Sequence, residues 1–211
     1  MLEEEYETAR RVLPRHLRKP PEAERPFGYT IREARATDLP SVQEIYNYYV
    51  ANSTVTFDER AMTLMDWRRK FQLMQNFNMP FVVAEAGNGQ LLGYSLAAPM
   101  RATRMGRSVA ENSIYLGPAA TGKGLGKALL GALIELARAK KIRELIAIIA
   151  DQGAQSSVQL HRSFGFVESG RMENVGYKFG RSLGTIMMQK SLKKAEPSLS
   201  QDRPSTENWN S

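Results

Sequence analysis

One stretch decides the fold, and it reads IYLGPAATGKGLGK from Ile114 to Lys127. An apolar segment with a strand pattern runs into a glycine-rich turn, and the turn runs directly into an amphipathic helix. The start of such a helix leaves about four backbone N–H groups without internal partners, and the helix dipole adds positive potential there. The turn therefore predicts an anion site suited to a pyrophosphate. The glycines that allow close approach of the backbone, and the lysines that add charge, are Gly122, Gly124, Gly126, Lys123 and Lys127.

The turn does not match two common phosphate-binding motifs. The Walker pattern G-x-x-x-x-G-K-[ST] is absent. A dinucleotide fingerprint, G-x-G-x-x-G, would need a glycine at Leu129 if it began at Gly124, or at Lys127 if it began at Gly122. A flexible loop at an ordinary helix start is the alternative, although three glycines there are costly for stability alone.

The chain alternates between strand and helix patterns around this stretch. Strands are predicted over residues 29–34, 81–86, 91–97, 111–116, 145–150, 166–174 and 185–192. Helices are predicted after the N-cap Asp38, after the N-cap Thr63, over residues 124–140 and over residues 156–164. The order β-α-α-β-β-β-α-β-α-β-β favours one α/β domain over residues 29–192.

The two ends of the chain differ from this domain in composition. Residues 1–28 hold four of the ten prolines together with balanced charges, and we interpret them as an N-terminal tail. Residues 193–211 are polar, rich in Ser and Pro, and without apolar periodicity. This composition predicts a disordered C-terminal tail.

Composition also excludes several classes of chemistry. The chain has no cysteine, and its two histidines, His16 and His161, cannot form a histidine-rich metal site, so we expect no metal. The longest apolar run, Leu145–Ala150, is far shorter than the roughly 20 residues of a membrane helix, so we expect a cytoplasmic protein with no membrane partner. The formal charge of +7 is spread out rather than gathered in one basic stripe, which argues against a nucleic-acid partner.

The turn resembles the acyl-CoA-binding motif of the GNAT superfamily, [QR]-x-x-G-x-[GA], at Thr121–Gly126, with Thr121 in place of the usual Gln or Arg. The resemblance implies the GNAT acyl-CoA N-acyltransferase fold, a central mixed, mostly antiparallel twisted sheet flanked by helices. It also implies that the turn binds the pyrophosphate of acetyl-CoA and that the preceding strand pairs with its pantetheine arm. The residues that it assigns to acetyl-CoA are Ile114, Tyr115, Leu116, Thr121, Gly122, Lys123, Gly124, Leu125, Gly126 and Lys127.

Further segments resemble one family within this superfamily, the phosphinothricin and methionine sulfoximine N-acetyltransferases. These segments are Asn47–Tyr49 with Ser53–Phe57, Ala110–Tyr115, Ser157–Phe166 and Gly176–Arg181. The resemblance implies direct transfer of acetyl from acetyl-CoA to the primary amine of a small amino acid or analogue. It also implies a homodimer, which is common in the family.

The resemblance assigns two catalytic residues. Glu111 matches the proposed general base, and His161 takes the place of the superfamily's tyrosine as proton donor to the CoA sulfur. Without the resemblance, the residues themselves favour a solvated carboxylate at a strand end for Glu111 and a buried helix histidine that satisfies a core hydrogen bond for His161.

Acceptor binding is the less defined part of the site. Arg101 matches a basic residue of the family's substrate pocket that can grip a carboxylate, and Lys178 could act similarly. Thr54 and Phe57 are expected to shape the pocket. Departures from the family pattern affect the acceptor and fall at Met100, Gly106, Ala154, Ser182 and Gly184.

These departures leave alternatives open. The acceptor could be another amine, such as a protein N-terminus, a lysine or a polyamine. The domain could instead bind acyl-CoA without transferring it, and a basic nucleic-acid binder is the remaining class.

Overall fold

The computed structural model describes residues 28–100 and 108–193, so the tails predicted at both ends lie outside the described residues, except for Gly28 and Lys193. The helices are α1 (Leu39–Asn52), α2 (Leu64–Asn76), α3 (Leu125–Ala139) and α4 (Gln155–Ser163). The strands are β1 (Tyr29–Glu33), β2 (Phe81–Ala86), β3 (Leu91–Pro99), β4 (Val109–Leu116), β5 (Glu144–Ala150), β6 (Val167–Lys178) and β7 (Arg181–Ser191). Their order along the chain is the predicted one.

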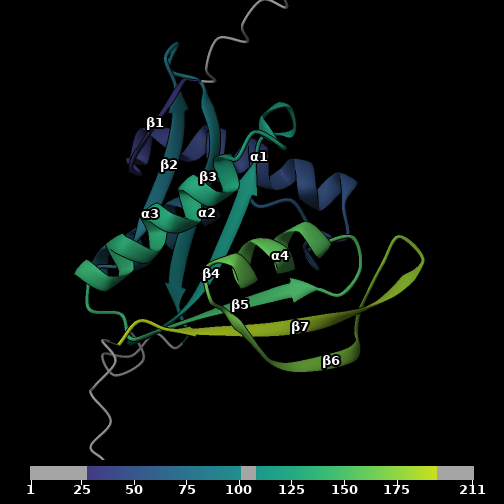
Figure 1. Ribbon diagram of the computed structural model, residues 1–211. Helices are drawn as coiled ribbons and strands as arrows, with labels where there is room; N and C mark the ends of the chain where they lie inside the picture. Colours follow the sequence, from purple (N-terminus) through teal and green to yellow (C-terminus); the bar gives the residue numbers. More distant parts are fainter. Residues whose placement is uncertain (1–27, 101–107, 194–211) are drawn as a thin grey trace, which may run out of the picture.

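All seven strands form one sheet in the order β1-β2-β3-β4-β5-β7-β6, in which the β4–β5 pair is parallel and the other pairs are antiparallel. Helices α3 and α4 cover one face, and α1 and α2 cover the other (Figure 1). Strand β4 shows this division directly. Its Asn112 contacts His161 of α4, whereas its Tyr115 packs against Tyr46 of α1 with ring centres 5.2 Å apart. The predicted α/β class with a mostly antiparallel sheet is confirmed.

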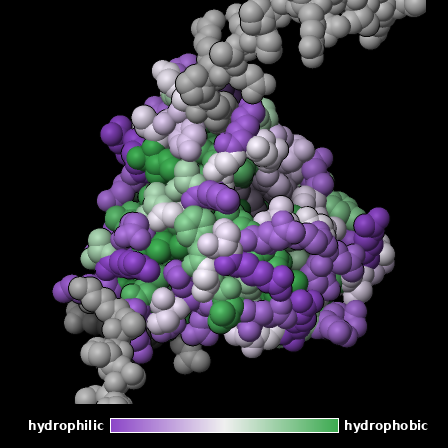
Figure 2. All heavy atoms as spheres, in the orientation of Figure 1, coloured by the Kyte–Doolittle hydropathy of each residue, from purple (hydrophilic) through white to green (hydrophobic). Residues whose placement is uncertain are grey.

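Apolar side chains of α3 form much of the core on its face of the sheet. Leu125, Leu129 and Leu133 recur every four residues and are fully buried. Figure 2 shows this side of the molecule, where hydrophobic residues reach the surface over α3 and mostly hydrophilic residues cover α4. The predicted cap of α2 is also confirmed, because Thr63 Oγ1 accepts a hydrogen bond from the Asp66 N–H at 3.1 Å.

The predicted cap of α1 is wrong in its contacts. Asp38 stands at the N-cap position, but its side chain makes no cap hydrogen bond. Its carboxylate instead accepts two hydrogen bonds from the Arg32 guanidinium, at 2.7 and 2.8 Å, and one from the Arg35 N–H at 2.7 Å. A charged partner on β1 therefore outcompetes the local helix N–H groups for this carboxylate.

The predicted end of β6 at Asn174 is also wrong. The strand continues to Lys178, with a register shift between Met172 and Gly176. Asn174 has φ 54°, a left-handed conformation that asparagine tolerates, and its Oδ1 accepts a hydrogen bond from Ser182 Oγ at 2.7 Å. The asparagine therefore marks a bulge inside the hairpin rather than the end of the strand.

Replacing Asp38 with asparagine should lower the free energy of unfolding by about 2 kcal/mol at pH 7, because hydrogen bonds to a charged group contribute about 1.5–3 kcal/mol. Burial alone would raise the pKa of Asp38, but the hydrogen bonds from Arg32 and the Arg35 N–H outweigh burial and lower it. The carboxylate therefore stabilises the fold fully above about pH 4, and its contribution is lost as the pH falls further.

Urea unfolding of wild type and Asp38→Asn between pH 3 and pH 7 measures this difference, which should shrink below about pH 4. Glu135→Gln removes an exposed carboxylate that lies 3.7 Å from Arg138, and it serves as the control with an unchanged midpoint. Equal midpoints for wild type and Asp38→Asn at pH 7 would show that the Arg32 contact contributes nothing.

Candidate functional site

Strands β4 and β5 separate in the middle of the sheet. Residues 109–112 of β4 pair with residues 144–147 of β5, and the pairing stops there. β4 nevertheless runs on to Leu116, and β5 runs on to Ala150. A gap therefore opens between the two central strands.

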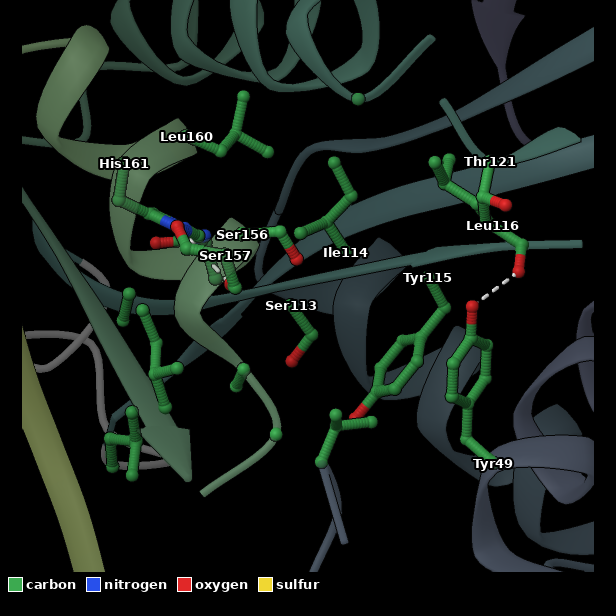
Figure 3. A pocket seen from close by; sticks show the side chains of 18 of the residues that line it. Tyr49, Ser113, Ile114, Tyr115, Leu116, Thr121, Ser156, Ser157, Leu160 and His161 are labelled. Atoms are coloured by element: carbon green, nitrogen blue, oxygen red, sulfur yellow. Dashed lines mark hydrogen bonds between the residues drawn. The ribbon is translucent and has the colours of Figure 1, made fainter. Parts of the chain in front are cut away.

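Backbone groups of β4 face this gap. Successive residues of a strand point their N–H groups to opposite sides, and the Gly117 N–H donates to the Leu92 carbonyl on the β3 side at 2.8 Å. The N–H groups of Leu116 and Ile114 therefore point toward β5. The Leu116 carbonyl accepts a hydrogen bond from Tyr49 Oη at 2.7 Å, as Figure 3 shows. This edge can pair with an extended ligand, as predicted for the pantetheine arm.

The turn before α3 requires glycine at two positions. Gly122 and Gly124 both have φ 76°, and a Cβ at either position would meet no atom within 4 Å, so conformation rather than space selects glycine. Gly124 is the N-cap of α3, and no side chain caps this helix end. Its first N–H groups are therefore available to an anion.

A cavity of about 330 Å³, which we call the α4-side cavity, runs along the gap between this turn and α4. Figure 3 shows Ser156, Ser157, Leu160 and His161 on its α4 side, and Thr121, Leu116 and Tyr49 at the other end. Of the residues predicted to bind acetyl-CoA, those that line it are Ile114, Tyr115, Leu116, Thr121, Gly122 and Gly126.

The other residues predicted for acetyl-CoA lie on the turn but do not line this cavity. Lys123, Gly124 and Lys127 are exposed. The Leu125 side chain is fully buried in the core, so Leu125 has only its backbone to offer a ligand. Thr121 Oγ1 donates to the Pro118 carbonyl at 3.1 Å, which ties this side chain to its own turn.

His161 is buried, and both of its ring nitrogens have partners. Nδ1 lies 2.8 Å from the Ser157 carbonyl oxygen, and Nε2 lies 2.9 Å from Asn112 Nδ2. Because a carbonyl only accepts, Nδ1 carries the proton and Nε2 accepts from the Asn112 amide. Burial lowers the pKa of His161, against the opposing effect of the Ser157 carbonyl, so the ring is neutral near pH 7.

A second cavity, of about 270 Å³, lies on the opposite face of the sheet, and we call it the α2-side cavity. Its lining residues are Tyr46, Val55, Thr56, Phe57, Asp58, Trp67, Lys70, Tyr94, Leu96, Glu111, Ser113, Tyr115 and Ile148. Burial raises the pKa of Glu111, and the nearby charge of Lys70 opposes this shift. A carboxylate with a raised pKa is a stronger proton acceptor than an exposed one.

The two cavities meet at the gap. Val55, Ser113, Tyr115 and Ile148 line both of them. One ligand in the α4-side cavity and another in the α2-side cavity could therefore face each other through the opening between β4 and β5. This arrangement suits a reaction between two substrates.

The residues predicted for acceptor binding lie in different parts of the structure, and not all of them line a cavity. Phe57 lines the α2-side cavity and packs against Gly176 of β6. Thr54 Oγ1 donates to the Gln152 carbonyl at 3.3 Å. Lys178 is buried and donates from Nζ to the Thr56 carbonyl at 2.9 Å, so it anchors the loop after α1 and lines neither cavity. Arg101, like Gly106, lies outside the described residues.

Two of the departures from the family pattern lie in β7, outside both cavities. Ser182 pairs with Asn174 within the β6–β7 hairpin. A Cβ at Gly184 would lie 2.6 Å from both Asp151 Oδ2 and the Met172 carbonyl oxygen, so no larger residue fits. The Gly184 N–H donates to Asp151 Oδ1 at 2.9 Å.

The sequence did not single out the cation of the α2-side cavity, Lys70. It follows Trp67 by three residues on α2 and precedes Phe71, both of which are buried. The sequence feature that could have indicated it is a lysine placed between the apolar positions of an amphipathic helix. Tyr94 of β3, fully buried in the same wall, carried no comparable signal because a core aromatic is ordinary.

Known proteins are similar to this chain in sequence. Residues 31–187 match the acetyltransferase (GNAT) domain family. A phosphinothricin N-acetyltransferase of Alcaligenes faecalis is 36% identical over 170 residues, which cover 81% of this chain and 86% of the relative. An L-methionine sulfoximine/L-methionine sulfone acetyltransferase of Pseudomonas aeruginosa is 39% identical over 163 residues, which cover 77% of this chain and 94% of the relative.

Solved structures of acetyltransferases are similar to this chain in fold. A phosphinothricin acetyltransferase of Sinorhizobium meliloti in complex with acetyl-CoA has a TM-score of 0.73 at 40% identity and covers 77% of this chain and 88% of its own. A Salmonella typhimurium structure with its cofactor acetyl-CoA has a TM-score of 0.74 at 35% identity, covering 82% and 99%. The fold and the paired cavities thus define a transferase that uses an acyl-CoA donor. The chain belongs to the GNAT acetyltransferase family, and acetyl-CoA is its acyl donor.

Two features are absent from the described residues. Within residues 28–100 and 108–193, no group of three or more His, Cys, Asp or Glu side chains is placed to hold a metal ion. In the same part of the chain, no helix is long and apolar enough to cross a membrane.

Replacing Gly124 with alanine should lower the free energy of unfolding by about 1 kcal/mol, because a Cβ disfavours the left-handed conformation. It should also raise the Kd for acetyl-CoA about tenfold, because the relaxed turn re-aims the N–H groups of α3. Thermal unfolding and isothermal titration calorimetry measure both effects. Gly87→Ala is the matched control, since Gly87 has an ordinary φ and open space around it. Wild-type affinity in Gly124→Ala would remove this turn from the binding site.

Proposed function

We propose that the protein acetylates the primary amine of a small free amino acid or a close analogue of the phosphinothricin or methionine sulfoximine type. The α2-side cavity carries this proposal, because it joins the acetyl-CoA side at the gap and contains a carboxylate of raised pKa. Its volume of about 270 Å³ lies just below the roughly 300–1,000 Å³ of sites for drug-sized ligands, which favours a small acceptor. The substrates named for relatives at 36% and 39% identity support the same class.

In this proposal Glu111 removes a proton from the acceptor ammonium, directly or through a water molecule. The freed amine nitrogen bonds to the thioester carbon as the carbon–sulfur bond breaks. The backbone N–H of Leu116 or Ile114, which faces the gap, donates to the oxygen that becomes negative. The acceptor nitrogen loses two protons between ammonium and amide, the first to Glu111 before attack and the second after the nitrogen–carbon bond has formed. One proton is taken up by the departing thiolate, and the other leaves to solvent.

His161 is the proposed donor of the proton that the thiolate takes up. Its Nε2 must first be protonated, and Nε2 now accepts from the Asn112 amide. A half-turn of that amide supports this step, because Asn112 Oδ1 is buried without a hydrogen-bond partner among the described residues and would accept from a protonated Nε2. The pair can thus hold His161 in either protonation state.

A homodimer, which the family resemblance implies, stays a prediction. It draws support from the exposed apolar side chains of β6, which include Val167, Val175 and Tyr177.

Glu111→Gln should lower kcat/KM by about 10²- to 10⁴-fold, the usual contribution of a general base, while acetyl-CoA binding stays unchanged. The assay follows thiol release from acetyl-CoA with phosphinothricin, methionine sulfoximine, methionine sulfone, common amino acids, polyamines and short peptides. Because burial raises the pKa of Glu111, the wild-type rate should rise with pH as Glu111 loses its proton, at a higher pH than an ordinary carboxylate would give. The variant should show no such rise.

Glu135→Gln again controls for loss of a surface carboxylate. Turnover of peptides or polyamines alone would identify another acceptor class and contradict the proposal. Binding of acetyl-CoA without turnover of any amine would indicate a non-catalytic acyl-CoA-binding module. Salt-sensitive binding of nucleic acid, without binding of acetyl-CoA, would indicate a nucleic-acid-binding protein.

His161→Asn should lower kcat by about 10²-fold, because the thiolate then leaves without a proton donor. The Kd for acetyl-CoA, measured by calorimetry below the thermal midpoint of the variant, should change little, although loss of the buried ring lowers that midpoint. A purely structural histidine would leave kcat unaltered in the folded variant.

A further inference from the structure

The α2-side cavity contains a cation that the proposed reaction does not use. Lys70 Nζ lies 5.2 Å from the centre of the Trp67 ring, one turn earlier on α2. No carboxylate of the described residues lies within ion-pair distance of this ammonium. Burial lowers the pKa of Lys70, while Glu111 and Asp58 favour its charged form. The cavity thus presents a partly buried ammonium that lies near Glu111 and Asp58 but forms no ion pair with any carboxylate of the described residues.

Two hydrogen-bonding groups in the same wall also lack partners. Trp67 Nε1 and Tyr94 Oη are buried, and no described atom pairs with either. Both residues line the cavity, with 1% and 0% of their surface exposed. The indole N–H only donates, and leaving a buried donor unpaired is costly, so such groups normally meet water or a ligand. Neither atom has accessible surface in this structure, whereas Lys70 is partly exposed and lines the cavity. A negatively charged group in the cavity would therefore meet Lys70 rather than these two donors.

Glu111, in contrast, favours a positively charged group in the ligand. Its carboxylate suits the amine of the acceptor, and Asp58, at the edge of the cavity, already accepts a hydrogen bond from Tyr46 Oη. A free amino acid carries an amine and a carboxylate on one carbon. Both groups therefore fit a small cavity that contains an anion and an unpaired cation.

We propose that Lys70 is a specificity-determining residue that binds the carboxylate of the acceptor. This inference rests on the proposed function and deepens it, because it makes a free carboxylate a requirement of the acceptor. Lys178, a second cation near the α2-side cavity, is buried and already donates a hydrogen bond to the Thr56 carbonyl. Arg101, predicted from the family resemblance for the same task, is the rival that the experiment must separate.

A different role for Lys70 would be to tune Glu111 alone. The ammonium holds the pKa of Glu111 below the value that burial would give it. Removing the charge would then move the acidic limb of the pH profile upward for every amine. Carboxylate binding, by contrast, distinguishes acceptors with a carboxylate from those without one.

The experiment compares L-methionine sulfone with its decarboxylated analogue, 3-(methylsulfonyl)propylamine, as acceptors for the full-length protein. For each variant, kcat/KM for the amino acid is divided by kcat/KM for the analogue, and this ratio is compared with that of the wild type. The two amines differ in basicity, but this difference is the same for every variant and cancels in the comparison. The variants are Lys70→Met, Lys70→Gln, Lys70→Arg and Arg101→Met. Methionine fills the same irregular space without charge, and calorimetry with acetyl-CoA verifies that each variant is folded.

Wild type should prefer the amino acid, and Lys70→Met and Lys70→Gln should each reduce this preference about 10- to 100-fold, the ratio expected for hydrogen bonds to a charged group. The reduction should come from the KM of L-methionine sulfone, with the KM of acetyl-CoA unchanged. The assays are run at a pH above the acidic limb, so that any shift in the pKa of Glu111 affects both acceptors alike. Lys70→Arg should retain most of the preference.

Three results would overturn the inference. One is an equal loss on both acceptors in the neutral variants, which would assign Lys70 to packing or to Glu111. Another is a preference abolished by Arg101→Met and kept by Lys70→Met. The third is a wild type that uses the analogue as well as the amino acid. A wild type that acetylates no amino acid would refute the proposed function itself, whereas the first three leave it standing.

Discussion

The site depends on one constraint, the separation of β4 from β5 beyond Asn112 and Ala147. Each strand is held by its outer neighbour past this point, since β4 stays paired with β3 as far as Leu116 and β5 with β7 as far as Ala150. The two strands therefore cannot rejoin, and the backbone groups between them have no strand partner. Unpaired backbone groups are costly when buried, so this gap favours water or an extended ligand.

The same strand lines both cavities. Successive side chains alternate between the faces of a sheet, so Asn112 reaches His161 on the α4 side while Glu111 enters the cavity on the α2 side. Two adjacent residues of β4 thus face the two cavities. The aromatic wall of the α2-side cavity, which includes Trp67 and Tyr94, removes water from Glu111 and Lys70, and charges interact more strongly in such surroundings.

Features set by neighbours in the sequence were predicted well. The strand and helix order follows from apolar periodicity, and the cap at Thr63 needs only Asp66 three residues later. Asp38 holds the predicted N-cap position without the expected cap hydrogen bond, and the strand end predicted at Asn174 was wrong, because distant partners decided both outcomes. Arg32 of β1 takes the Asp38 carboxylate, and β7 continues to pair with β6 beyond the bulge at Asn174.

The sequence by itself determined the glycine-rich turn at the start of α3, because an anion site at a helix start is built from consecutive residues such as Gly122 and Gly124. Only the tertiary structure decided which residues share the α2-side cavity. Lys70 comes from α2, Tyr94 from β3 and Glu111 from β4, and these elements form one cavity only when the sheet and its helices pack together. No local pattern records such contacts, since the physical cause is burial shared by segments far apart in the chain.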